Sequence, residues 1–194
     1  MTVSIDELGR RQPQLEQERD AVFERTFQDH WARVTGVVFR LVGDRAEAED
    51  IALDTFWRLY QRKARQPTNV SAWLYRVATN RGLNALRARA RREAYEGRAG
   101  RAALERETAP NPEAEAIRAA VRRDVRGTLA HMRQRSARLL VLRHSGCSYA
   151  DIAAALNISA GSVGTLLARA EREFERQYGK PPPGEEKEQD HALE

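Results

Sequence analysis

The sequence predicts an all-α fold, made of two small helical domains joined by a flexible linker. Apolar residues recur at spacings of three and four along most of the chain, the pattern of helices with one buried face. The chain shows no alternating pattern of the kind that predicts β-strands. Between the two helical stretches, residues 93–116 hold two glycines, two prolines and few large apolar side chains, which predicts the linker.

The first domain is expected to span residues 21–92, after a flexible N-terminal segment of residues 1–20 that could in part extend the first helix. The first helix should end at Gly43, and Asp44 is placed to cap a second helix, with Glu47 three residues later. Ser71 is placed to cap a third helix, which should run to about residue 92. The apolar positions of the three helices are Phe23, Phe27, Trp31, Val34, Val38 and Leu41, then Ala48, Ile51, Thr55, Phe56, Leu59 and Tyr60, then Leu74, Val77, Ala78 and Ala85.

The second domain is expected to span residues 117–178, and its last part has the pattern of a helix-turn-helix. Ser148 can cap a short helix, with Asp151 three residues later, and residues 157–159 form a tight turn before the final helix. The alternative is a plain helical hairpin of another all-helical domain. The apolar positions of the domain are Ile117, Val121, Val125 and Leu129, then Leu139, Leu140 and Leu142, then Ile152, Ala153 and Leu156, then Val163, Leu167, Ala170 and Phe174. Residues 179–194 are Pro-rich and then charged, which predicts disorder.

Composition favours an anionic partner and argues against several kinds of site. Lys and Arg number 33 against 28 acidic residues, which gives a net charge of +5 and a pI near 9.8. Cys147 is the single cysteine and the four histidines are scattered, so no metal-ligand spacing is present. No apolar run approaches the ~20 residues of a membrane span, and the N-terminus lacks the apolar core of a signal peptide. We expect a cytoplasmic protein with no metal, cofactor or small-molecule substrate.

The predicted third helix carries a polar stripe, formed by Trp73, Arg76, Asn80, Asn84, Arg87 and Arg91 at spacings of three and four. Eight arginines and two acids lie between residues 76 and 101. Guanidinium groups neutralise phosphates, aromatic rings stack on bases, and amides can hydrogen-bond base edges. The stripe therefore suits a single strand or an opened duplex; the alternative is a solvated arginine face with Trp73 against the core.

Acidic residues cluster on the predicted second helix: Glu47, Glu49, Asp50 and Asp54, next to Phe56 and Trp57. Acids in the first turn favour the helix dipole, but Asp54 lies too far along the helix for that explanation. An acidic and apolar ridge suits a protein partner. The chain assembles no nucleophile, base and orienting group, so we do not expect an enzyme.

With these motifs in place, the chain resembles the extracytoplasmic-function sigma factors, which bind core RNA polymerase and direct it to promoters. The segments EAEDIALDTFWRLYQR and VSAWLYRVATNRGLNALRARARR resemble sigma region 2, and the helix-turn-helix resembles region 4. The resemblance implies core RNA polymerase and promoter DNA as partners, and an anti-sigma factor as regulator.

The resemblance also implies roles for particular residues. Polymerase binding would fall to Ala48, Glu49, Asp50, Ile51, Asp54, Thr55 and Phe56. Recognition and opening of the −10 element would fall to residues 65–71 and to Trp73, Arg76, Asn80, Asn84 and Arg87. Recognition of the −35 element would fall to residues 159–172, in particular Ser159, Ser162, Thr165, Leu166, Arg169 and Arg172.

The chain departs from the family pattern in its last helix. Family members often carry Lys or Arg where this chain has Gly164 and Leu166, and here three arginines are balanced by Glu171, Glu173 and Glu175. Such a helix predicts weak duplex binding with a shallow salt dependence. Two other functions compete with the sigma factor hypothesis: a stand-alone helix-turn-helix regulator, and an interaction protein without a DNA role.

Overall fold

The computed structural model describes residues 5–62, 67–96 and 112–179, and in these residues it contains seven α-helices and no β-strand. Three helices form an N-terminal unit: α1 (Ile5–Val42), α2 (Arg45–Tyr60) and α3 (Val70–Glu96). Four helices form a C-terminal unit: α4 (Pro112–His131), α5 (Gln134–His144), α6 (Tyr149–Leu156) and α7 (Ala160–Gln177). The predicted all-α class is confirmed.

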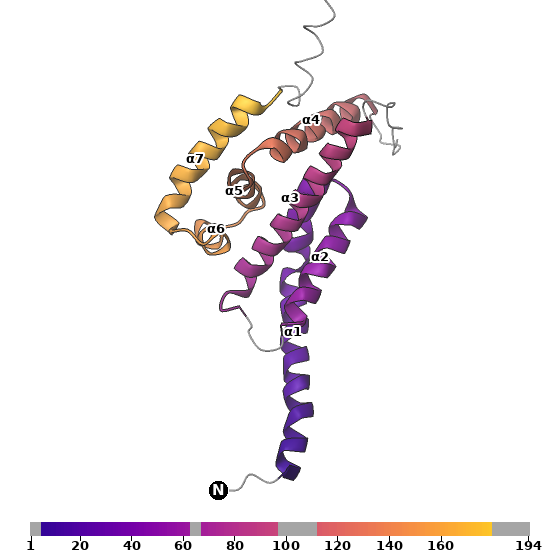
Figure 1. The fold of residues 1–194 in the computed structure, drawn as a ribbon, viewed down its shortest axis with the longest axis vertical. Helices are drawn as coiled ribbons and strands as arrows, with labels where there is room; N and C mark the ends of the chain where they lie inside the picture. The colour runs from indigo at the N-terminus through magenta and orange to yellow at the C-terminus, as the bar shows by residue number, and fades with distance from the viewer. Residues whose placement is uncertain (1–4, 63–66, 97–111, 180–194) are drawn as a thin grey trace, which may run out of the picture.

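The two units pack against each other through α3, which runs through the centre of the molecule (Figure 1). α3 contacts α1 and α2 on one side and α4, α5 and α6 on the other, and α1 also contacts α5. Buried residues of both units belong to one hydrophobic cluster. The sequence predicts two helical domains; the structure contains both, and they pack in a closed arrangement in which their buried residues share one hydrophobic cluster.

Helix boundaries follow local capping chemistry, and one predicted cap is wrong. Asp44 caps α2 as expected, since its Oδ1 accepts the amide of Glu47 at 2.7 Å. α3 is capped by Asn69 rather than Ser71: Asn69 Oδ1 accepts the amide of Ala72 and the hydroxyl of Ser71, both at 2.9 Å. Both residue types are good N-caps, and the chain uses the one that starts the helix earlier.

The helices also extend further than predicted. α1 begins at Ile5, inside the segment expected to be a flexible lead-in, and extends beyond the other helices at its N-terminal end (Figure 1). α3 continues to Glu96, and α4 begins at Pro112. Most of the predicted linker and of the predicted C-terminal tail lies outside the described residues.

Two of the four residues predicted to form the apolar face of α4 are exposed in the structure. Leu129 is buried and Val125 is half-buried, but Ile117 and Val121 are exposed by 60% and 47%. The N-terminal half of α4 lies beside the end of α3, away from α5, α6 and α7 (Figure 1). The helical period is therefore correct, but the first two turns have no core beneath them.

A pair of glycines tests the close packing of α1 against α3. A Cβ atom added at Gly82 would lie 2.8 Å from Cδ1 of Leu41, whose side chain is fully buried. Overpacking costs about 1–3 kcal/mol, whereas alanine gains at most about 1 kcal/mol over glycine in a helix. We expect Gly82→Ala to lower the free energy of unfolding. The control is Gly127→Ala in α4, where no atom lies within 4 Å of the added Cβ, so stability should rise. Urea denaturation measures the free energy of unfolding of both variants. A change of the same sign in the two variants would contradict the close approach of α1 and α3 at Gly82.

Candidate polymerase and nucleic-acid interfaces

The residues proposed for polymerase binding on α2 divide into buried and accessible sets. Ala48, Thr55 and Phe56 are fully buried, so they position the helix but cannot contact a partner. Asp50 is exposed and forms no ion pair with any described residue. Next to it, Leu53 and Trp57 are exposed by 49% and 56%. We call Asp50, Leu53 and Trp57 the α2 ridge; its two apolar members were missing from the predicted site, although the i, i+3, i+7 spacing places them on one face.

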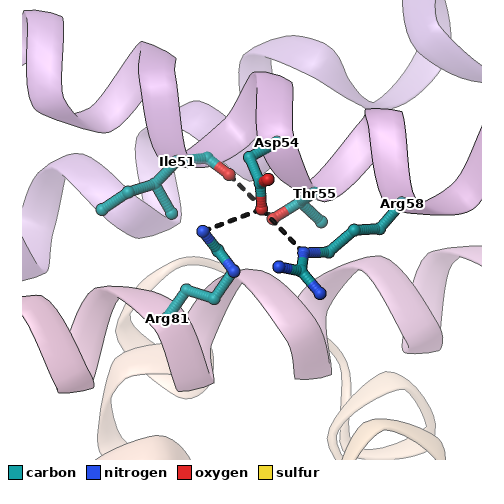
Figure 2. A network of polar contacts seen from close by, with 5 residues as sticks. All are labelled: Ile51, Asp54, Thr55, Arg58 and Arg81. Carbon is teal, nitrogen blue, oxygen red and sulfur yellow. Dashed lines mark hydrogen bonds and ion pairs between the residues drawn. The ribbon is translucent and has the colours of Figure 1, made fainter.

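Asp54 has a role inside the fold (Figure 2). Its Oδ2 atom accepts a hydrogen bond from Arg58 Nε at 2.8 Å and lies 2.8 Å from Arg81 Nη2 on α3. The carboxylate thereby joins α2 to α3. Its side chain is 36% exposed, so solvent screens both ion pairs.

The polar stripe on α3 is accessible only in part. Arg76, Asn84 and Arg91 are exposed. Trp73 packs at the edge of the hydrophobic cluster, and the guanidinium of Arg62 lies 5.5 Å from its ring centroid. Of the loop predicted before α3, residues 63–66 lie outside the described residues.

The other two stripe residues are held by the C-terminal unit. Arg87 donates from Nε to the carbonyl of Ala130 at 3.1 Å and from Nη2 to that of Met132 at 2.8 Å, which caps the end of α4. Arg138 on α5 donates from Nη1 to Asn80 Oδ1 at 2.8 Å. We call these contacts the latch. They occupy side chains that the sequence assigns to DNA.

The latch brings like charges together. Burial lowers the pKa of the Arg138 guanidinium, and the nearby Arg135, Arg76 and Arg87 lower it further. Burial similarly lowers the pKa of Arg126 on α4, which lies next to Arg122 and Arg89. The closed arrangement therefore gathers positive charge at the junction of the two units, where an anionic partner would be attracted.

The helix-turn-helix is confirmed in its local detail. Ser148 and Asp151 form the expected capping box on α6. Asn157 ends α6 in the left-handed conformation (φ 53°), and the chain bends by 88° between α6 and α7. Val163, Leu167 and Ala170 are buried, which leaves the opposite face of α7 outward.

Most of the predicted −35 residues are exposed, whereas Leu166 is half-buried and packs against the hydrophobic cluster. Ser159, Ser162, Thr165, Leu166 and Arg169 line one hollow. Arg172 is exposed, with its Nε donating to the carbonyl of Ala168 at 3.1 Å. The lining of the hollow also includes Arg135 of α5, which is not among the predicted −35 residues.

Cys147 is buried, with 6% of its surface exposed, between α5 and α6. Burial raises the pKa of its thiol to about 11, and the nearby carboxylate of Asp151 adds to the effect. Among the described residues no group of His, Cys, Asp and Glu could hold a metal ion. In the same part of the chain no single helix is long and apolar enough to cross a membrane, although the bent pair α6 and α7 meets those criteria together.

Comparisons with known proteins match both units. Residues 26–92 match the sequence model of Sigma-70 region 2, and residues 122–174 match that of Sigma-70 region 4. The chain is 28% identical over 158 residues to the RNA polymerase sigma-H factor of Pseudomonas aeruginosa, a match that covers 74% of this chain and 79% of that protein. It is 29% identical over 151 residues to the ECF RNA polymerase sigma factor SigE of Mycolicibacterium smegmatis, which covers 76% of this chain and 58% of that protein.

Two solved structures align with this chain. CnrH, in complex with the cytosolic domain of CnrY, aligns with a TM-score of 0.51 at 19% identity and covers 81% of this chain and 87% of that one. The sigma factor RpoE of Bartonella quintana, in complex with the anti-sigma factor NepR, aligns with a TM-score of 0.47 at 18% identity, over 80% and 95% of the two chains.

Alkylation of Cys147 should report the burial of its thiol. Folding disfavours the thiolate, so the native thiol should stay protonated until the pH approaches 11. We expect iodoacetamide to modify the native chain slowly up to about pH 9, and the urea-unfolded chain rapidly from about pH 8.5, the ordinary pKa of cysteine. Mass spectrometry gives both rates. Equal native and unfolded rates would mean that Cys147 is accessible.

Proposed function

Because the chain belongs to the sigma-70 family, as a sigma factor of the extracytoplasmic-function type that binds core RNA polymerase and directs it to promoter elements, we propose which of its surfaces carries each step. The α2 ridge docks on polymerase, the polar stripe of α3 binds the opened −10 element, and α7 binds the −35 element. The main support for this proposal is that the matched regions 2 and 4 coincide, in order, with the N-terminal and C-terminal units.

The α2 ridge suits a protein partner for a physical reason. Trp57 is exposed while it stacks on Tyr60, with ring centroids 5.6 Å apart, so its orientation is fixed before binding. Exposed aromatic residues held in this way are common energetic centres of interfaces. Asp50 adds an unpaired negative charge that would attract a basic surface.

Promoter binding requires the latch to open. Asn80 and Arg87 make contacts with α5 and with the end of α4, and the same donors and acceptors would be needed for nucleic acid. We therefore propose that the closed arrangement is a resting state, and that docking on polymerase separates the two units. An anti-sigma protein is the proposed regulator, because it would gain a rigid surface made by both units.

Two further aspects belong to the same proposal. The family consists of transcription regulators, and we propose that this chain performs no catalysis of its own and acts in the cytoplasm, where polymerase and promoters are found. A stand-alone helix-turn-helix regulator is disfavoured, because it would leave the region 2 match without a role.

The polymerase surface is tested with two matched variants on α2. Trp57→Ala should weaken binding to core polymerase by about 2 kcal/mol or more, roughly 30-fold, because truncation of a central aromatic contact costs this much. Its melting temperature should hardly change, since the side chain is exposed. Asp54→Asn should instead lower the melting temperature, because it weakens the bridge to Arg81. The measurements are fluorescence titration with core polymerase and thermal unfolding; full affinity of a folded Trp57→Ala variant would refute the assignment.

The latch is tested by Arg138→Ala. Losing a charge-assisted hydrogen bond costs about 1.5–3 kcal/mol, which exceeds the screened repulsion that the change relieves. We expect a larger radius of gyration by X-ray scattering, and at least about fivefold tighter binding of a single-stranded −10 oligonucleotide, equivalent to about 1 kcal/mol.

The control for the latch is Arg143→Ala on the same helix, whose guanidinium stacks on Tyr149 instead of reaching α3. Adding Trp73→Ala to Arg138→Ala should abolish the gain in oligonucleotide binding. Unchanged size and affinity for Arg138→Ala would show that the latch does not limit access to the stripe.

A further inference from the structure

The hollow beside α7 has a charge that the sequence of α7 alone does not predict. Its lining residues include Arg135 and Arg169, the hydroxyl-bearing Ser159, Ser162 and Thr165, and no acidic residue. All of these residues come from α5, α7 and the turn before α7. The hollow therefore belongs to the C-terminal unit alone and does not depend on the latch.

One of the three acids expected to oppose this charge, Glu173, is engaged elsewhere. Glu173 accepts the backbone amide of Arg133 at 2.8 Å through Oε1 and the hydroxyl of Ser136 at 2.6 Å through Oε2. Arg133 is the N-cap residue of α5, and its own side chain makes no capping hydrogen bond. Glu173 thus caps the N-terminus of α5, and its negative charge is partly compensated by the amide and hydroxyl donors there.

This cap also determines where Arg135 lies. It joins the first turn of α5 to α7 one turn beyond Arg169, and Arg135 sits in that first turn. Arg135 is exposed and forms no ion pair with any described residue. Its guanidinium is therefore available at the rim of the hollow.

We propose that Arg135, which lies outside the helix-turn-helix, is a DNA contact of the −35 surface and binds the backbone phosphates beside α7 together with Arg169. This inference rests on the proposed function of α7. Hydroxyl groups in the same lining as two arginines are donors suited to phosphate oxygens. Arg135 accordingly contributes affinity without reading sequence.

The test measures the salt dependence of DNA binding by the full chain, using a 30-base-pair duplex of random sequence as the probe in fluorescence anisotropy. Each phosphate contact contributes about 0.9 to the slope of log affinity against log salt. Arg135→Ala should weaken binding several-fold and make the slope shallower by about 0.9, whereas Arg135→Lys should retain the slope. Arg169→Ala should have a similar effect, and the matched control Arg176→Ala, on α7 outside the hollow, should change the slope less.

A second comparison removes an indirect explanation. Arg135 is one of the charges near Arg138, so Arg135→Ala could act by strengthening the latch. In the Arg138→Ala background, Arg135→Ala should still lower the slope by about 0.9. A loss of the effect in that background, or an unchanged slope in both, would overturn the proposal.

Failure of the Arg135 proposal can be distinguished from failure of the proposed function. If Arg135→Ala leaves the slope unchanged while Arg169→Ala lowers it, α7 binds DNA and Arg135 does not take part. If the wild-type chain with core polymerase starts no promoter-dependent transcription on a promoter library, the proposed function itself is wrong. Circular dichroism of Arg135→Ala and Arg135→Lys checks that each variant is folded.

Discussion

The burial of α3 from both sides is the constraint on which the rest of the structure depends. Leu74, Ala78 and Leu83 are fully buried, and each buried leucine stabilises the fold by about 1.5–3 kcal/mol. The helix packs so closely on α1 that Gly82 has no room for a side chain. The same helix also carries the polar stripe. One helix is thus both core and candidate DNA surface, and the C-terminal unit cannot pack on α3 without covering part of the stripe.

The chemistry of arginine makes this double use workable. Arg87 donates to carbonyls at the end of α4, and Arg89 donates to the carbonyl of Val42 at the end of α1 at 3.0 Å. The C-terminal ends of helices carry unpaired carbonyls and partial negative charge. Like a phosphate group, they offer oxygen acceptors to the N–H donors of a guanidinium. In the proposed open arrangement, Arg87 would exchange carbonyl oxygens for phosphate oxygens, so its donors need not stay unpaired. The cost of opening then falls mainly on the buried apolar contacts.

Most local patterns were predicted well from the sequence, apart from the cap of α3, and contacts between distant helices were not. The cap at Asp44, the capping box at Ser148 and the turn at Asn157 depend on residues within four positions of one another, so spacing suffices to find them. The exposure of Ile117 depends on which helices lie beneath α4, which its own period cannot reveal. The same limit applies to the latch, because Asn80 and Arg138 lie 58 residues apart in the sequence.

Acidic residues give the clearest case of this limit. The sequence assigns Asp54 to a partner protein and sets Glu173 against the arginines of α7, and both assignments count charge along a single helix. In the structure each carboxylate faces a neighbouring helix: Asp54 bridges to Arg81, and Glu173 caps α5. A carboxylate that already accepts such donors presents a weaker field to an outside ligand, because its charge is partly compensated before the ligand arrives. The formal neutrality of α7 is therefore a poor guide to the side proposed to face DNA, where Arg135 and Arg169 line a hollow that has no acidic residue in its lining. The electrostatics of a binding face follow from the side chains that line it, and these come from α5 as well as from α7.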